Sequence, residues 1–471
     1  MAPRAEFLTL RNVSSTPLTV TSFATFPLAS KQKGPAPITI KNLHNIGNLT
    51  QHLSSALRTS GVAPASGPTS IVIAENAKAF TESAAKLVVL PFATVKTDIR
   101  VTHGAGDVVR LVFEVLDSGG KFRIDLDSSS SPSVICLTPS SPHRFHSVFH
   151  SSHAHVALLS TAPLHKWQTQ LHDSVSLCSL SIPGTHNSPT CYRALPSVRC
   201  QAVSIRTQLE HGIRFFDIRC QVESSGELTL VHAAFPISLS LPAKKLSTLL
   251  ERTYQFLDEH PGETVIISLK REGWGGATDE VFARHLREQY IEPQAHRWWL
   301  DHTRVPTLGE ARGKCILFRR FLSATWEAGI NAEDWEYNSY DTSTPGGMCR
   351  VQDFCEVLDT PTIEKKIRYI REHLDRAAVP TNVNQLFLNF LSGCNFWKVG
   401  CWPENVARKV NIEVKRHLAI DHGGGGTCGV VICDFVGERG EWDLVRLVVA
   451  MNGWIKTKDE DSENEVLALE T

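Results

Sequence analysis

The chain has 471 residues, of which 42% are hydrophobic and 21% charged, and its formal net charge at pH 7 is −1. Because the positive and negative charges nearly cancel, the chain creates no overall electric field that would attract nucleic acid, so we expect no nucleic-acid partner. No stretch approaches the roughly 18 consecutive apolar residues of a membrane span, and no apolar segment follows the first residues as in a secretory signal. We therefore expect a cytoplasmic or peripheral membrane protein without a transmembrane segment. Secretion and the oligomeric state are left open.

A chain of this length exceeds the usual size of one hydrophobic core, so two domains are expected. Residues 1–162 contain short segments in which apolar and polar residues alternate, as in half-buried strands. Residues 107–124 predict a β-hairpin that turns at Gly119-Gly120, and residues 42–58 predict a short helix. We expect a smaller β-rich, sandwich-like N-terminal domain, whose role the sequence does not indicate.

Residues 163–457 alternate apolar, strand-like runs with helical patterns, which predicts a parallel sheet in an α/β fold. Seven or so strands over this length fit a distorted TIM (β/α) barrel. An open doubly wound sheet is the alternative, but no glycine-rich phosphate loop follows the first strand. The acidic residues 458–471 predict a disordered tail. The predicted strands span 176–182, 213–218, 228–231, 263–269, 314–318, 385–390 and 429–435, and the main helices span 205–211, 246–259, 279–289, 363–377 and 405–418.

Polar residues follow these predicted strands at their carboxyl ends. The first strand is expected to turn sharply at Pro183-Gly184 and to present His186. Because active sites of parallel barrels lie at the carboxyl ends of the strands, we expect these side chains to meet there. The residues at the strand ends are His186, Asp217, Arg219, His232, Lys270, Arg319, Arg320, Asn389 and Asp434.

The types of these residues indicate acid–base chemistry on a phosphate. Two histidines can act as general base and general acid, since imidazole titrates near neutral pH. An arginine can bind a phosphate and stabilise the charge that develops on it, and a buried aspartate can fix the tautomer of one histidine. No nucleophile elbow and no metal-ligand spacing is present, so we expect no cofactor and no metal. The set suits cleavage of a phosphodiester by a neighbouring hydroxyl.

Residues 170–450 resemble the bacterial-type phosphatidylinositol-specific phospholipase C family, including its fungal X-domain relatives. The resemblance implies a distorted TIM barrel and a phospholipid substrate met at a membrane surface. It also implies attack of the inositol 2-hydroxyl on phosphorus without a metal, which gives diacylglycerol and a cyclic inositol phosphate. The motifs that carry the resemblance lie at 181–188, 208–219, 230–232, 256–270, 308–314 and 432–435.

The resemblance also implies catalytic roles. His186 is similar to the family's general base, oriented by Asp434, and His232 resembles its general acid. Arg219 looks like the arginine that takes the place held by calcium in the eukaryotic relatives. Asn187 stands where the bacterial enzymes usually have aspartate, and we expect it to hydrogen-bond His232.

Substrate contacts are implied at the positions that match the family's inositol site, namely Lys270, Arg320 and Asp353. A tyrosine that stacks on the ring is expected just after Asp353, but this chain has Phe354-Cys355 there. Another phospholipid or a glycerophosphodiester therefore stays open as the substrate, and a non-enzymatic lipid-binding or scaffold protein as the third reading. The aromatic loop 396–402 either contacts lipid or packs at the barrel rim.

Overall fold

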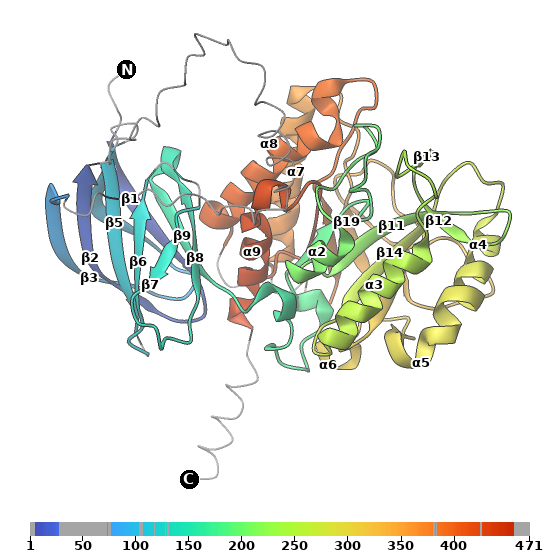
Figure 1. Cartoon of the computed structure of the whole chain (residues 1–471), viewed down its shortest axis with the longest axis horizontal. Helices are drawn as coiled ribbons and strands as arrows, with labels where there is room; N and C mark the ends of the chain where they lie inside the picture. The colour runs from blue at the N-terminus through green and yellow to red at the C-terminus, as the bar shows by residue number, and fades with distance from the viewer. Residues whose placement is uncertain are drawn as a thin grey trace, which may run out of the picture.

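The computed structural model describes residues 5–27, 73 and 77–455, apart from 103–106, 117, 128, 130, 380–381, 383 and 424–425. The short helix expected at 42–58 and the acidic tail expected at 458–471 lie outside the described residues. The chain forms a β-rich part and, beside it, an α/β part, which appear at the left and right of Figure 1.

The N-terminal part consists of two sheets with the strand orders β4-β1-β9-β8 and β3-β2-β5-β6-β7. The predicted hairpin is confirmed, since β5 and β6 pair antiparallel. Apolar side chains from both sheets share one core, in which Phe113 stacks on Phe122. The strands are β1 Ala5–Val13, β2 Leu18–Pro27, β3 Thr81–Val89, β4 Thr94–Thr102, β5 Asp107–Val115, β6 Lys121–Leu126, β7 Val134–Cys136, β8 Phe145–His150 and β9 His155–Ser160.

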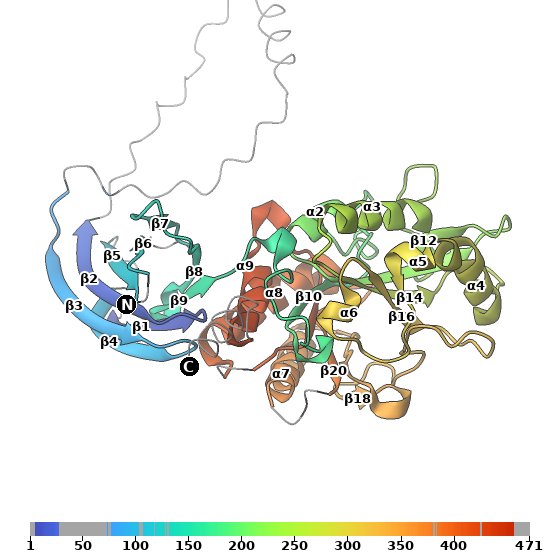
Figure 2. The ribbon, with the colours of Figure 1, turned by 90° about the horizontal axis from the view of Figure 1, so that it is seen from below.

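The second part is built on parallel strands in the order β16-β14-β11-β10-β21-β20-β19. Among the described residues no ladder joins β16 to β19, so the barrel is open along that side. Figure 2 shows the helices on the outside of these strands. The strands are β10 Ile182–Thr185, β11 Phe215–Val222, β12 Leu228–His232, β13 Phe235–Pro236, β14 Val265–Arg271, β15 Trp299–Leu300, β16 Cys315–Arg320, β17 Ile330–Asn331, β18 Thr342–Ser343, β19 Cys349–Gln352, β20 Leu386–Phe390 and β21 Val430–Cys433.

The predicted helices are confirmed with small shifts at their ends. Helix α3 buries the apolar stripe that its periodicity predicts, including Leu246, Leu250 and Leu257. No described helix is long and apolar enough to cross a membrane. The α-helices are α2 Ile205–Glu210, α3 Leu246–Glu259, α4 Asp279–Leu286, α5 Ala295–Trp298, α6 Leu308–Ala311, α7 Thr360–Ala377, α8 Pro403–Arg416 and α9 Asp443–Ala450, and α8 continues into the π-helical turn η9 His417–Asp421.

The prediction for the first barrel strand was wrong. Leu177–Ser179 forms a 3-10 turn, and the strand runs over Ile182–Thr185 with Pro183 and Gly184 inside it. A side chain at Gly184 would meet the Phe215 Cβ at 3.0 Å and Ile432 at 3.3 Å. The glycine therefore serves close packing of three neighbouring strands, and the chain turns after Thr185 instead.

The two parts are joined by hydrogen bonds that end on the turn η9. Arg11 on β1 donates to the carbonyl oxygens of Leu418 and His422, and the Nε2 of His155 on β9 lies 3.0 Å from the carbonyl oxygen of Ala419. Arg11 is 2% exposed, and burial lowers its pKa to about 10. These contacts fix the β-rich part against the carboxyl end of α8.

Candidate active site

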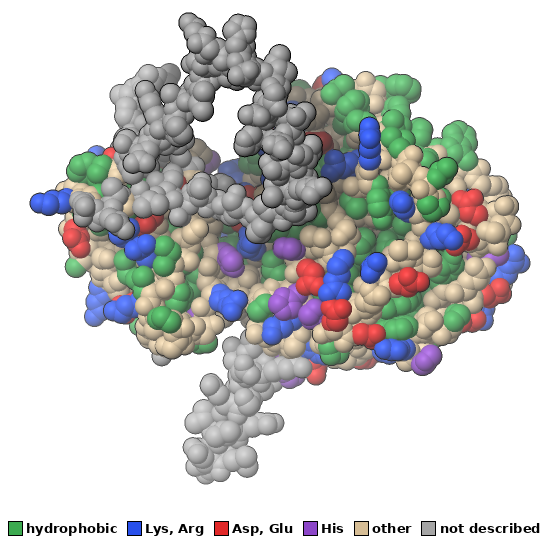
Figure 3. All heavy atoms as spheres, in the orientation of Figure 1, with side chains coloured by type: hydrophobic (Ala, Val, Ile, Leu, Met, Phe, Trp, Pro, Cys, Tyr) green, Lys and Arg blue, Asp and Glu red, His purple; other side chains and the backbone are tan. Residues whose placement is uncertain are grey.

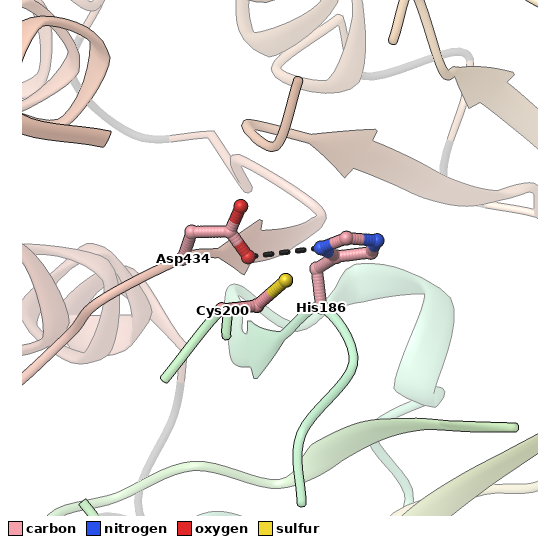
Figure 4. A group of neighbouring side chains, drawn as sticks. All are labelled: His186, Cys200 and Asp434. Carbon is pink, nitrogen blue, oxygen red and sulfur yellow. Dashed lines mark hydrogen bonds and ion pairs between the residues drawn. The ribbon is translucent and has the colours of Figure 1, made fainter. Parts of the chain in front are cut away.

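The histidine and the aspartate of the predicted catalytic pair meet because their strands are neighbours in register. Strands β10 and β21 are parallel, with Thr185 opposite Cys433, so the residues that follow, His186 and Asp434, leave the sheet side by side. The Nδ1 of His186 lies 2.9 Å from an oxygen of Asp434 (Figure 4). Burial raises the pKa of the Asp434 carboxyl, against the opposing effect of His186. The pair leaves the Nε2 of His186 as the atom available for chemistry.

A second imidazole faces the first. His232 ends β12, and its ring centre lies 6.0 Å from that of His186 with the two planes nearly perpendicular, at 89°. Its Nδ1 lies 2.7 Å from the carbonyl oxygen of Val198. Burial, together with the nearby Arg219 and His186, lowers the pKa of His232 to about 4. Its Nε2 is therefore the nitrogen left to exchange a proton.

Three cationic side chains form a row across the barrel. Arg219 on β11 is opposite Lys270 on β14, and Lys270 is opposite Arg320 on β16. In parallel strands, residues that face one another across a ladder project to the same side of the sheet. All three side chains line one cavity. Such a row attracts an anion, and a phosphate is the anion that guanidinium groups bind best through paired hydrogen bonds.

Two carboxylates, the buried Asp217 and the partly buried Glu272, hold this row in place. Asp217 accepts a hydrogen bond from Arg219 at 3.2 Å and another from Arg320 at 2.9 Å. Burial alone would raise the pKa of Asp217, but the two guanidinium groups bring it well below its usual range. Glu272 pairs with Arg219 at 2.9 Å and with Lys270 at 3.2 Å, and these cations outweigh burial and lower its pKa to about 2.

The structure corrects the expectation for Asn187. Its side-chain Nδ2 lies 3.1 Å from the Nε2 of His186, whereas His232 is held by the carbonyl of Val198. The backbone of Asn187 has a φ of 41°, and its N–H donates to Asp217 at 3.1 Å. The residue turns out of β10 in a left-handed conformation that asparagine tolerates, and this turn aims its amide at the neighbouring histidine.

The predicted site residues lie together, with one exception. A cavity of about 460 Å³ opens at the carboxyl ends of the strands, and Asn187 lies behind its wall. The predicted residues that line this cavity are His186, Arg219, His232, Lys270, Arg320, Asp353 and Asp434.

Aromatic side chains form the outer wall of the cavity. The indole of Trp335 donates to Asp353 at 3.2 Å, and the guanidinium of Arg320 lies 4.1 Å from the centre of its ring. Tyr337 lines the cavity together with Cys355, and its hydroxyl donates to Glu356 at 3.0 Å. An aromatic ring is therefore present beside the position where Cys355 replaces the expected tyrosine.

Sequence reasoning missed three of these residues as parts of the site. Glu272 lies two residues after Lys270 on β14, so its period-two spacing was the available signal. Trp335 and Tyr337 lie in the connection after β17, where no periodic pattern marks them. The buried thiol of Cys200, beside His186 in Figure 4, lies 3.8 Å from the Nδ1 of His232.

Known proteins share this barrel. The family profile described as phosphatidylinositol-specific phospholipase C, X domain, matches residues 174–321. A protein named 1-phosphatidylinositol phosphodiesterase from Staphylococcus aureus (strain Newman) is 26% identical over 318 residues, which is 64% of this chain and 98% of its own length. One of the same name from Listeria monocytogenes is 33% identical over 159 residues, which is 32% of this chain and 47% of its own length. The solved phosphatidylinositol-specific phospholipase C of Staphylococcus aureus has a TM-score of 0.54 at 24% identity and covers 61% of this chain and 96% of that chain.

Proposed function

The α/β part of this chain belongs to the bacterial-type phosphatidylinositol-specific phospholipase C family, and on that premise we propose that it cleaves phosphatidylinositol-like lipids between the phosphate and diacylglycerol. The observation that carries the proposal is the row of Arg219, Lys270 and Arg320 beside two imidazoles whose centres lie 6.0 Å apart. Arg219 in this row binds the phosphate, and the imidazoles provide a base for the attacking hydroxyl and an acid for the departing ester oxygen.

His186 acts as the general base. Its Nδ1 proton is held on Asp434, so Nε2, which also contacts the amide of Asn187 at 3.1 Å, is the nitrogen that takes the proton of the inositol 2-hydroxyl. The hydroxyl oxygen forms a bond to phosphorus while the bond from phosphorus to the diacylglycerol oxygen breaks. Asn187, at 3.1 Å from the same Nε2, can turn its amide oxygen toward the imidazolium that forms and stabilise it.

His232 acts as the general acid. Its Nδ1 is held on the carbonyl oxygen of Val198, so Nε2 gives its proton to the departing diacylglycerol oxygen. Burial depresses the pKa of His232 to about 4 in the free protein, and the negative charge of a bound phosphate opposes that depression. The acid is therefore formed efficiently only when the substrate phosphate is bound.

Arg219 supplies the charge that this reaction needs without a metal. Asp217 and Glu272 hold the guanidinium from two sides, which fixes its direction before the substrate arrives. A fixed cation at the non-bridging oxygens stabilises charge that develops there in the transition state. A calcium ion at the same place would meet a guanidinium that is 15% exposed and already paired, so we propose a metal-independent reaction.

The headgroup site combines charged and aromatic groups. Lys270, Arg320 and Asp353 line the cavity and can donate to or accept from the ring hydroxyls. We assign to Tyr337 the apolar face against which the ring packs, because Cys355 offers no aromatic surface. This arrangement supports an inositol headgroup over the alternative of an unrelated glycerophosphodiester, which would use few of these polar groups.

A membrane surface is the proposed place of action. The loop 396–402 continues from the cavity wall, and Trp397 in it is 89% exposed. Phe396 stacks on Phe235 of the β12–β13 hairpin, which links this loop to the strand that carries His232. Figure 3 shows hydrophobic side chains gathered along the upper edge of the α/β part. Exposed aromatic and aliphatic side chains near the cavity suit peripheral contact with lipid.

The proposal divides the chain into a sandwich-like N-terminal module over residues 1–162 and a catalytic barrel over residues 163–457. The two N-terminal sheets share a core of their own, and Val13, Val148, Ala157 and Leu159 on their other face pack into the core of the barrel. None of the residues that line the catalytic cavity comes from these sheets. The module therefore acts on stability or location and leaves the chemistry to the barrel.

Phosphorus NMR of the full chain with phosphatidylinositol vesicles tests this function. We expect a cyclic inositol phosphate signal in the presence of chelator, and its loss in His186→Ala and His232→Ala, with Asp258→Asn on the surface as a matched control. Activity on another phospholipid alone would establish the alternative substrate. Absence of turnover on every lipid, with binding to vesicles retained, would establish the non-enzymatic reading.

A further inference from the structure

A group of two histidines and an aspartate lies away from the catalytic cavity, at the junction of the two parts of the chain. We propose that Asp375, His417 and His422 form a zinc site. The three side chains each offer one ligand atom, and these atoms all lie within 4.8 Å of one another. Imidazole nitrogens and a carboxylate oxygen are the ligands that zinc takes in sites with three protein ligands and one water.

The local backbone brings the two histidines to the same side. His417 begins the π-helical turn η9, and the N–H of His422 donates to the carbonyl oxygen of His417 at 2.8 Å. In an α-helix, residues five apart differ by about 140° around the axis and face different ways. The wider turn of a π-helix closes this angle, so both imidazoles turn toward α7. Such turns are often found at functional sites, since they cost helix stability.

Two of the three separations between the ligand atoms are close to those around a tetrahedral ion. One oxygen of Asp375 lies 3.0 Å from the Nε2 of His417 and 3.3 Å from the Nδ1 of His422. Ligands about 2.0–2.1 Å from zinc at tetrahedral angles are about 3.3 Å apart. A small outward movement of these side chains is therefore enough to admit the ion. Zinc binds the unprotonated ring nitrogens, so any proton that they carry is released when the ion binds.

The surroundings orient the ligands and leave an entrance. The other nitrogen of His417, Nδ1, lies 3.8 Å from a carboxylate oxygen of Asp421, which favours the tautomer that presents Nε2 to a metal. The side chain of His422 is fully buried and that of His417 is 6% exposed, whereas Asp375 is 54% exposed. Two ligands are thus fixed, and solvent reaches the ion past the third.

The position of the site indicates what the ion does. Its histidines bracket the turn whose carbonyl oxygens accept hydrogen bonds from Arg11 and His155 of the β-rich part. Zinc would tie the end of α7 to this turn and so hold the surface on which the β-rich part rests. We infer a structural site that stabilises the junction and that is independent of the proposed phosphodiester cleavage.

Zinc binding by the full chain, stripped of metal with a chelator, tests the proposal. Competition with a chromophoric chelator should show one zinc per chain, and cobalt should give the intense visible bands of a tetrahedral ion. Asp375→Asn should bind zinc at least tenfold more weakly and should lose the rise in melting temperature that zinc gives the unmodified chain. We expect the same two losses, of zinc affinity and of zinc-dependent stabilisation, in His417→Asn.

Two control variants separate this site from the other groups that resemble metal ligands. Glu259→Gln alters the surface group of Glu210, Glu259 and His260, and His186→Ala alters the catalytic group that includes Cys200 and Asp434. Both controls should keep the zinc. Absence of zinc binding by the unmodified chain, unchanged affinity in Asp375→Asn, or loss of the zinc in either control would overturn the proposal.

Discussion

Replacement of Asp217 by asparagine removes the negative charge on which two buried guanidinium groups depend. The carboxylate is fully buried and bonds Arg219 at 3.2 Å and Arg320 at 2.9 Å. Asparagine has nearly the same shape, so packing is preserved and the effect is electrostatic. Arg219 keeps its contact with Glu272, whereas Arg320 is left as the uncompensated cation.

The magnitude follows from the burial of this group. A carboxylate and a guanidinium 3–4 Å apart attract each other by about 4 kcal/mol at an effective dielectric constant of 20. Asp217 makes two such contacts, and its own desolvation offsets part of the gain. Removal of one partner from a buried pair costs about 3–5 kcal/mol, so we expect a loss of about 3 kcal/mol. For a barrel of about 300 residues, that loss lowers the melting temperature by roughly 5 °C.

Activity should fall with stability, because Arg219 no longer has a fixed direction. A misplacement of about 1 Å at a reacting centre costs about 10²-fold in rate, and we expect a loss of that size in kcat/KM. The pH dependence has a defined sign. Because the pKa of Asp217 is depressed in the folded chain, its stabilising effect is complete above the unfolded value of about 3.9 and is lost only as the pH falls below it. The difference between the variant and the unmodified chain should therefore be constant near neutral pH.

Calorimetry at pH 7 and phosphorus NMR of lipid turnover measure the two effects on the same preparations. Asp258→Asn is the control, since Asp258 pairs with Arg297 on the surface at 44% exposure and such pairs contribute less than about 1 kcal/mol. A variant at Asp217 that melts within about 2 °C of the unmodified chain and retains its turnover would refute the reasoning.

Three further changes test the proposed chemistry. Because the pKa of His232 is about 4 in the free protein and rises when phosphate binds, the basic limb of kcat/KM should lie at lower pH than that of kcat, and coincident limbs in pH–rate profiles would contradict this. Arg219→Lys should lower kcat at least about 10²-fold, since a lysine cannot span both carboxylates, and recovery upon addition of calcium would speak for a metal-dependent mechanism. Trp397→Ala should weaken sedimentation with phosphatidylinositol vesicles several-fold while turnover of a water-soluble inositol phosphodiester changes less, and equal effects on both would rule out a role in lipid contact.

The sequence marked His186 and His232 as candidate catalytic residues because each follows an apolar run that is typical of a buried strand. His186 and His232 were recognised as residues at strand ends, and they do meet. The expected parallel arrangement was wrong for His232, because β12 runs antiparallel to β11 and carries His232 back to the site on a hairpin. The predicted hydrogen-bond partner of Asn187 was wrong. A single φ of 41° sets the direction of that side chain, and no pattern of residue types encodes such an angle. Glu272 was missed because a carboxylate at a strand end resembles any solvated residue until its neighbours are known.

Apolar periodicity and the order of the motifs thus predicted by themselves the alternation of strands and helices, the barrel and four of the candidate catalytic residues, namely His186, Arg219, His232 and Asp434. Tertiary structure decided everything that depends on distance between remote segments. The row of Arg219, Lys270 and Arg320 exists only because three strands share one register. Asp375 meets His417 although 42 residues separate them. Local sequence sets which face of an element is apolar, whereas the packing of those faces decides which charged and polar side chains come into contact.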